Sequence, residues 1–269
     1  LGMILVQRDD VVDGNHTLSN TVFGLDGQAH LSKQLSVEGE AFVSGHGVKA
    51  DPSAQSDLSF AGKLKGVWKT DEYRIQARYR GVGETFDSEA GFIPRQGFHE
   101  GFVKLDGYYR SDNPWARTVS PGLWVRYNIG SDNALEDRVI GMNTYWQFGH
   151  RVWSFMKLEH NGELVEHRDD DDVLLGTQWM EATEFYLSVG SSTWRWVSMK
   201  TGIGLGQTPI RDSDLWADAG RDEPFLGWYY APNAEIELRP TSYMRIELDY
   251  AHSMFFDGPH GALLGDQPR

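Results

Sequence analysis

The sequence predicts an all-β protein, an up-and-down antiparallel transmembrane β-barrel, and three observations support this prediction. Apolar and polar residues alternate with a period of two through most of the chain, and helical periodicity is almost absent. Short and long connections alternate between the predicted strands, as they do at the two ends of an outer-membrane barrel. Tryptophan and tyrosine gather beside the short connections, where a membrane barrel carries an aromatic girdle.

Thirteen segments show the two-residue alternation, each close to the about 9 to 11 residues of a tilted membrane-spanning strand. They span residues 1–9, 17–31, 35–44, 58–69, 73–82, 98–110, 117–129, 139–149, 152–160, 177–189, 195–206, 225–239 and 243–255. Bacterial single-chain barrels have an even number of strands, and residues 255–269 resemble the start of another long loop. We therefore expect a single β-barrel domain over residues 1–269 that is truncated at both ends, from an incomplete barrel of about 14 strands or more.

The connections predict which end of each strand faces which side of the membrane. The short ones are SKQ (32–34), TDE (70–72), SDNPWA (111–116), HR (150–151), SSTW (191–194) and PTS (240–242). The long ones lie near residues 10–16, 45–57, 83–97, 130–138, 161–176 and 207–224. This pattern predicts short periplasmic turns and long extracellular loops, whereas a soluble Greek-key sandwich has no reason to keep such a rhythm.

Aromatic residues flank the short connections. They are Trp68 and Tyr73, Tyr109 and Trp115, Trp146 and Trp153, Trp194 and Trp196, and finally Tyr243. Amphipathic rings favour a membrane interface, so these residues are expected to form a girdle. The alternative is that aromatic residues are simply common in strands.

Residues 60–81, FAGKLKGVWKTDEYRIQARYRG, show the alternation most clearly. Leu64 and Trp68 alternate with lysines, and Ile75 and Tyr79 alternate with arginines, so one face is apolar and the other carries six positive charges. In a soluble protein the apolar face would form the core. In a transmembrane barrel it contacts lipid, and the basic face points into a water-filled lumen.

The polar face is predicted to carry charges that neutralise each other. Glu38 and Glu40 lie on the polar face of the preceding strand, so acidic and basic side chains should lie side by side if the strands pair in order. Residues 235–239 and 245–249 repeat this pattern across the PTS turn. The candidate lumen charges are Glu38, Glu40, Lys63, Lys65, Arg74, Arg78, Arg80 and Arg126. Charges left unpaired would set the selectivity for a permeant.

Composition excludes several classes of function. The net charge of −14 argues against a nucleic-acid partner, because such a protein usually has a concentrated basic surface. The chain has no cysteine, so neither disulfides nor thiolate metal sites stabilise it. No apolar run approaches the about 18 residues of a membrane helix. No phosphate loop, dinucleotide fingerprint or zinc motif occurs, so no cofactor is expected.

Two segments carry a resemblance to a known family. Residues 20–45 contain an N-x-V-x-G-x-D pattern at Asn20, Val22, Gly24 and Asp26. Residues 84–98 contain F-[DN]-x-E-x-G-F-[IV]-x-R at Phe86, Asp87, Glu89, Gly91, Phe92, Ile93 and Arg95. The chain thereby resembles the C-terminal region of bacterial envelope proteins in which an N-terminal family-nine-like carbohydrate-binding module precedes a large outer-membrane β-barrel domain of unknown function. The resemblance covers about the first 130 residues, and only the strand rhythm extends it further.

This resemblance implies a barrel in the outer membrane, with no established catalytic residues to carry over. The carbohydrate-binding module is not in this sequence, so the glycan recognition that it would supply is not either. Within the 83–97 loop, Pro94 stiffens the chain, and Phe86, Phe92 and Phe98 are candidates to anchor the loop inward over the barrel mouth. The alternative is a loop packed on its own aromatic side chains.

Other candidate sites are weaker. The carboxylates Asp169, Asp170, Asp171 and Asp172 supply enough oxygen ligands for a cation such as calcium, but an acidic run is usually a solvated loop. His252 and Ser253 are adjacent in a strand and therefore point to opposite faces, which argues against a hydrolase site. Glu181 with Glu184, or Glu235 with Glu237, are possible glycosidase pairs that ion pairing explains more simply.

The sequence thus predicts a non-enzymatic bacterial outer-membrane β-barrel that acts as a channel, transport or anchoring barrel linked to glycan or polymer handling at the cell surface. Its expected partners are outer-membrane lipid and lipopolysaccharide, with a glycan or another small solute as the candidate permeant in the lumen. The alternative is a soluble β-rich carbohydrate-active enzyme or carbohydrate-binding module that uses its tryptophans and carboxylates.

Overall fold

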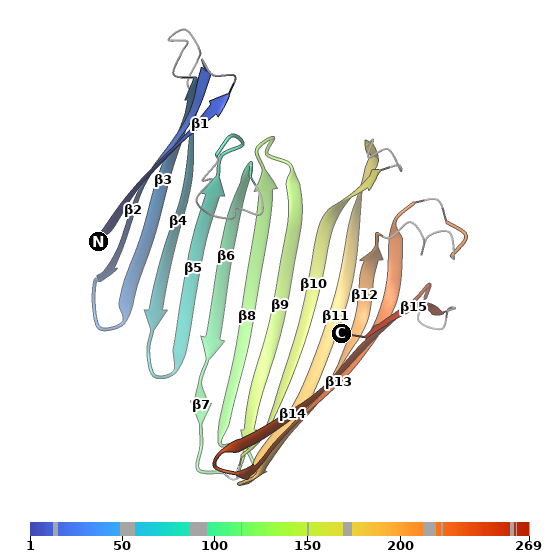
Figure 1. Ribbon diagram of the computed structural model, residues 1–269. Helices are drawn as coiled ribbons and strands as arrows, with labels where there is room; N and C mark the ends of the chain where they lie inside the picture. The colour runs from blue at the N-terminus through green and yellow to red at the C-terminus, as the bar shows by residue number, and fades with distance from the viewer. Residues whose placement is uncertain are drawn as a thin grey trace. The chain divides into compact units, whose positions relative to one another are not determined.

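The structure is a computed structural model, and it consists of β-strands (Figure 1). It describes residues 1–12, 16–48, 57–86, 96–113, 115–149, 151–168, 174–211, 219–221, 223–258, 261 and 263–268. These residues include no helix, and hence no helix long and apolar enough to cross a membrane.

Fifteen strands form one antiparallel sheet. They are β1 (Gly2–Val12), β2 (His16–His30), β3 (Leu35–Val48), β4 (Asp57–Lys69), β5 (Tyr73–Val82), β6 (Phe98–Gly107), β7 (Tyr109–Arg110), β8 (Thr118–Gly130), β9 (Leu135–Phe148), β10 (Val152–Arg168), β11 (Leu174–Trp194), β12 (Val197–Ile210), β13 (Phe225–Thr241), β14 (Met244–Phe256) and β15 (Leu263–Pro268). Sequential strands are neighbours throughout, except that β6 precedes β8 in the order and β7 pairs only with β8. The prediction of an all-β, up-and-down antiparallel sheet is confirmed, although β1 and β15 are the two ends of the described sheet, which is not closed.

Several predicted boundaries were wrong. Residues 130–138 are not a long loop, because only residues 131–134 separate β8 from β9. The SSTW segment belongs to β11, and the tight turn lies at Arg195 and Trp196. Residues 263–268 are not part of a loop but form β15, which pairs with β14. The strict alternation of short and long connections therefore does not hold at every position.

The described residues divide into two compact units, which are treated separately below. Unit 1 comprises Leu1–Lys104 with Arg126–Glu136, and unit 2 comprises Leu105–Val125 with Asp137–Arg269. In both units, "turn end" means the strand ends joined by the short connections, and "loop end" means the opposite ends. The prediction of a single domain stays a prediction.

Unit 1 has one apolar face that is exposed and one polar face that is partly buried. On β4 the exposed fractions of Leu58, Phe60 and Leu64 are 74, 59 and 56%. The alternating position Lys63 keeps only 25% of its side chain exposed. The buried side chains of β2 to β6 all belong to the polar face: Asn20, Val22, Ser44, Ser59, Ala61, Val82, Phe98 and Glu100. The hydrophobic pattern of unit 1 is thus opposite to that of a water-soluble protein.

Unit 2 repeats this arrangement on β10 to β14. The alternating positions of one face carry exposed apolar side chains, among them Met156, Leu158, Leu187, Val189 and Leu248. The buried side chains belong to the other face, and they include Val165, Met180, Ala182, Ser188, Ile210, Phe225, Glu237 and Ser253. Each unit therefore has one face on which large apolar side chains are exposed.

Most of the predicted girdle is exposed at the turn end. Trp68 and Tyr73 pack edge to face across the first such turn, with ring centroids 5.3 Å apart. The other exposed members are Tyr109, Trp115, Trp146, Trp194, Trp196 and Tyr243. Trp153 differs from this expectation, because it lies on the polar face of unit 2 and its ring covers Gly190. The glycine, which has no Cβ, leaves the space that the ring occupies.

Glycines opposite large rings recur in unit 2. A Cβ on Gly141 would lie 2.2 Å from the Trp124 ring, and one on Gly162 would lie 2.4 Å from the Trp179 ring. Both distances are far below van der Waals contact, so each ring occupies the volume of the missing side chain. A glycine in a strand otherwise weakens it, and here close ring packing accounts for its presence.

We expect Gly141→Ala to lower the free energy of unfolding by about 1–2 kcal/mol, because the new methyl group must displace the Trp124 ring. The matched control is Gly66→Ala, also in a strand, where a Cβ meets nothing within 4 Å. That variant should be neutral or slightly stabilising, since alanine restricts the unfolded chain. Urea unfolding of both variants in the same lipid or detergent measures the difference. Equal losses would contradict the ring-packing explanation.

The ladder between β11 and β12 ends partway along both strands. Its last register pair toward the loop end is Glu184 with Gly206, although both strands continue beyond it. There β11 stays paired with β10, and β12 stays paired with β13. A pocket of about 730 Å³ opens in this region, with Trp179, Met180 and Phe225 among its lining residues. The alternation of apolar and polar residues in the sequence does not indicate that the β11–β12 ladder ends there.

Candidate functional site on the polar face of unit 1

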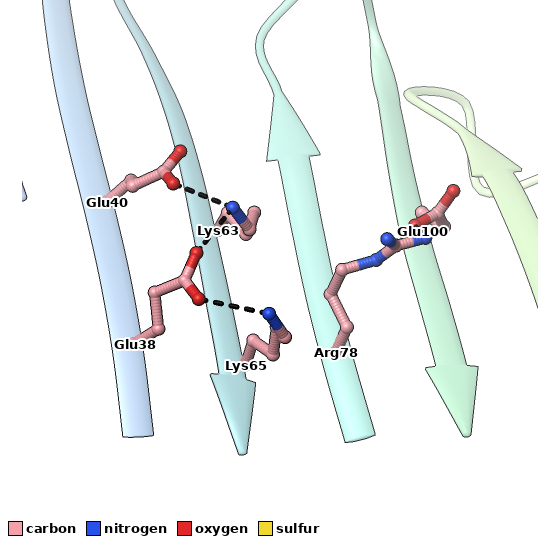
Figure 2. Close-up of polar contacts among 6 residues, drawn as sticks. All are labelled: Glu38, Glu40, Lys63, Lys65, Arg78 and Glu100. Atoms are coloured by element: carbon pink, nitrogen blue, oxygen red, sulfur yellow. Dashed lines mark hydrogen bonds and ion pairs between the residues drawn. The ribbon is translucent and has the colours of Figure 1, made fainter. Parts of the chain in front are cut away.

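The charged side chains of β3 and β4 form a ladder in register. Glu38 lies opposite Lys65, and Glu40 lies opposite Lys63. Lys63 Nζ is 2.7 Å from Glu40 Oε1 and 2.9 Å from Glu38 Oε1, while Lys65 Nζ is 3.0 Å from Glu38 Oε2 (Figure 2). The side-by-side arrangement expected for these acidic and basic residues is therefore present. Residues 49–56 separate β3 from β4, so no tight turn sets this register, and it agrees instead with the alternation of polar and apolar residues on the two strands.

The ladder continues onto β5 and β6. Arg80 pairs in register with Lys63, and Arg78 pairs with Lys65. Two cations side by side would repel each other, and the carboxylate that offsets this repulsion is Glu100 on β6. Its Oε1 atom is 2.7 Å from Arg78 Nη2 (Figure 2). Its Oε2 atom is 4.0 Å from Arg80 Nη2.

Glu100 was not among the predicted site residues, yet it is the most buried ionic side chain of this ladder, with 5% exposed. The alternation in FHEGFVKLDG places Glu100 on one face with Phe98, Phe102 and Lys104, so a signal existed in the sequence. The guanidinium of Arg78 also lies 5.0 Å from the centroid of the Phe102 ring, a distance typical of a cation–π contact. Glu100 and Phe102 together therefore hold Arg78 in place.

We expect Glu100→Gln to lower the free energy of unfolding by about 2 kcal/mol, since it leaves two guanidiniums without their shared carboxylate. This value lies below the range for fully buried pairs, because Arg78 and Arg80 are partly exposed to water. Glu72→Gln, in the exposed turn between β4 and β5, removes the same charge and should change stability by less than about 0.5 kcal/mol. Chemical denaturation of both variants decides whether the ladder stabilises the sheet.

The two remaining predicted lumen charges are placed differently. Arg74 lies near the turn end of β5 and donates a hydrogen bond of 2.9 Å to Gln76 on the same strand. Arg126 is half-buried on β8 and also takes part in polar or electrostatic interactions. Within the described residues, Arg74 is not among the side chains in contact with Glu38, Glu40 or Glu100. The ladder of β3 to β6 therefore does not include Arg74.

An apolar cluster closes the loop end of this ladder. Phe86 and Phe98 are each 2% exposed and pack with Val22, Ala61 and Val82, which belong to the polar face of β2, β4 and β5. Phe86 therefore packs both over the polar face and on Phe98, so this cluster is compatible with either explanation given for residues 83–97. The family-motif residues Asp87, Glu89, Gly91, Phe92 and Arg95 lie outside the described residues.

Unit 2 carries its own ion pairs on the polar face. Glu237 accepts a hydrogen bond from Arg239, and its Oε1 atom lies 3.0 Å from Arg245 Nε. Arg245 also forms an ion pair with Glu247. Lys200 lies 4.0 Å from Glu235. The charge pattern expected across the PTS turn is present only in part, because Arg245 pairs with Glu237 across the turn, whereas the register places Glu235 opposite Asp249 and Glu237 opposite Glu247.

The apolar face of unit 2 is interrupted by one polar cluster. Arg138 Nη2 lies 2.7 Å from Glu181 Oε1, and His160 Nε2 lies 3.5 Å from Glu181 Oε2. Trp179 Nε1 donates to the same carboxylate at 3.3 Å. Along β10 the exposed apolar residues Met156 and Leu158 lie on the turn side of His160. This cluster therefore marks the loop-side limit of the uninterrupted apolar band.

Two of the candidate catalytic pairs are divided between the two faces, whereas the third, Glu235 with Glu237, shares the polar face and takes part in ion pairs. Glu181 lies on the apolar face, whereas Glu184 lies on the polar face, so the two carboxylates cannot attack one bond together. Ser253 is fully buried, and His252 lies on the opposite face, where it stacks on Tyr250. The candidate cation ligands Asp169, Asp170, Asp171 and Asp172 lie outside the described residues. In the described part of the chain, no group of three or more His, Cys, Asp or Glu side chains is arranged to hold a metal ion.

Comparison with known proteins adds no assignment. No protein-family model matches the chain, and no curated protein matches it either.

Proposed function

We propose that this chain is a wall segment of a bacterial outer-membrane β-barrel, with its apolar face against lipid and its charged face toward a wet lumen. It would serve, without catalysis, as a channel, transport or anchoring barrel linked to glycan or polymer handling at the cell surface. Lipid and lipopolysaccharide are the proposed partners of the apolar face, and a glycan or another small solute is the proposed permeant.

The observation that carries this proposal is the inverted distribution of exposed side chains. Leucine, phenylalanine and methionine are exposed on one face of each unit, while lysine, arginine and glutamate are half-buried on the other. Exposing so many large apolar side chains to water is unfavourable by about 25 cal/mol for every Å². Contact with hydrocarbon removes that penalty, and charged side chains remain hydrated inside a lumen.

Two further observations support the same proposal. The exposed tryptophans and tyrosines at the turn end match the girdle of a membrane interface. The pattern at Asn20, Val22, Gly24 and Asp26, with the motif at 86–95, supports membership in the family with an N-terminal family-nine-like carbohydrate-binding module. Membership itself stays part of the proposal.

The first test is whether the purified chain requires detergent. We expect it to precipitate or aggregate in plain buffer, to become monodisperse in detergent, and to insert into lipid vesicles with an increase in β-sheet signal. A chain that stays monomeric in buffer without detergent would support the alternative, a soluble carbohydrate-active enzyme or binding module.

The channel role has a separate test. We expect the full-length protein to conduct in planar bilayers, with Arg78→Glu shifting the ion preference toward cations, because it reverses a charge on the polar face. Lys33→Glu makes the same change of charge in the exposed turn before β3 and should leave the preference unchanged. If the protein inserts but does not conduct, anchoring replaces passage as the proposed role.

A further inference from the structure

Two backbone hydrogen bonds at the turn end of unit 2 join three segments, at residues 151, 192–196 and 239. The Ser192 N–H donates to the Arg151 carbonyl at 2.9 Å, which links β11 to the turn before β10. The Arg239 N–H donates to the Trp196 carbonyl at 2.8 Å, which links β13 to the turn between β11 and β12. The three segments are therefore held in a fixed arrangement rather than projecting separately.

Three arginines line a small pocket between these segments. The pocket has a volume of about 150 Å³, and its lining includes Arg151, Arg195 and Arg239 with Trp194 and Trp196. Both tryptophans are more than half exposed, at 52 and 57%. A concentration of positive charge is notable in a chain with a net charge of −14.

The lining of this pocket carries three guanidinium groups and one carboxylate. The only carboxylate in the lining is Glu237, which is already shared by Arg239 and Arg245. Arg151 Nη1 donates a long hydrogen bond of 3.5 Å to the Ser192 carbonyl. Within the described residues, neither Arg151 nor Arg195 has a carboxylate within ion-pair distance.

The backbone at Arg151 adds an independent observation. Its φ angle is +65°, in the left-handed region that glycine adopts freely and most other residues avoid. A residue held in this region raises the conformational energy by roughly 1–2 kcal/mol, and such positions concentrate at ligand-binding sites. The backbone of this turn would favour glycine at position 151, so the turn geometry does not explain why an arginine is there.

From these observations we infer that the pocket binds one anionic phosphate group. Guanidiniums from three segments surround a volume suited to a single tetrahedral anion, and arginine is the side chain best matched to phosphate oxygens. Free phosphate and the headgroup of an anionic phospholipid share this chemistry. The exposed Trp194 and Trp196 are the residue type found where headgroups lie. The inference goes beyond the proposed barrel function, because the pocket is lined by residues at the turn end and does not depend on what the apolar face contacts.

The test is calorimetric titration of the full chain with two probes, inorganic phosphate and monomeric dihexanoylphosphatidylglycerol, and with dihexanoylglycerol as the uncharged control. We expect saturable binding of at least one anionic probe. Arg195→Gln and Arg151→Gly should each weaken it by about tenfold or more, the usual effect of losing a charge-assisted contact. Arg151→Gly also relieves the left-handed backbone, so it should fold at least as well as the unaltered chain.

Arg117→Gln is the matched control, because Arg117 is an exposed arginine at a tight connection of unit 2 that does not line the pocket. It should bind both probes as the unaltered chain does. Equal affinity for the two probes identifies free phosphate as the ligand, and tighter binding of the lipid identifies a headgroup. The inference is overturned if neither anion binds saturably, if the two pocket variants bind normally, or if the uncharged lipid binds as tightly. The titrations run in buffer if the chain proves soluble, so this result is independent of the barrel proposal.

Discussion

Leu64→Arg is expected to lower the free energy of unfolding in a lipid bilayer by about 2–4 kcal/mol, the penalty for a cation at the lipid-facing midplane of a barrel. Leu64 is in the middle of β4, and 56% of its surface is exposed on the apolar face. The same substitution at an exposed site in water changes stability by about 0.5 kcal/mol or less. The size of the effect in lipid vesicles therefore reports directly what surrounds this face.

Gln28→Arg provides the comparison for this measurement. Gln28 is an exposed residue on the polar face of β2, where it pairs in register with Glu38. An added arginine there should remain hydrated and should lower stability far less than the same residue at position 64. If the two variants unfold at the same urea concentration in lipid, the apolar face is not in hydrocarbon, and the proposed function fails with it.

Phe86→Ala is expected to lower the free energy of unfolding by about 3 kcal/mol or more, which is typical for truncation of a buried phenylalanine. Phe86 is only 2% exposed and packs with Phe98, Val22, Ala61 and Val82 at the loop end of the ladder. Its backbone carbonyl also accepts a hydrogen bond from Gln96 Nε2, a contact that truncation of the side chain leaves in place. Urea unfolding followed by tryptophan fluorescence measures the loss.

Tyr243→Ala is the control for this loss, because Tyr243 lies in a turn with 99% of its surface exposed. It removes an aromatic ring without emptying a packed volume, so its effect should stay below about 0.5 kcal/mol. A loss at Phe86 as small as that at Tyr243 would mean that the apolar cluster does not secure the loop end.

The strands that could be predicted are those whose two faces differ chemically. On β4 and β5, lysine and arginine alternate with leucine, tryptophan and tyrosine, and the predicted spans match the structure within one residue. Near the loop end of β9 and β10 the apolar face carries Arg138 and His160, so both faces are polar there. Because apolar and polar residues no longer alternate there, the sequence predicts loops at residues 130–138 and 161–176, although most of these residues are in strands.

The ladder of Glu38 and Glu40 with the β4 lysines could be predicted, because acidic and basic residues alternate with apolar ones on two consecutive strands, although residues 49–56 separate these strands. The role of Glu100 depends on how the chain returns after residues 83–97, for which the sequence gives no register. The arginine pocket draws on three separate connections, and β15 lacks alternation and is defined by its pairing with β14.

The early end of the β11–β12 ladder distinguishes one part of unit 2 from a continuous wall. Beyond Gly206 the described residues of these two strands share no register pair, so no ladder joins β11 to β12 there. Side chains of both faces line the pocket in this region, with Trp179 and Glu181 from the apolar one and Met180 and Phe225 from the polar one. Under the proposed function, this seam is the position in unit 2 where a molecule dissolved in the leaflet would meet side chains of both faces.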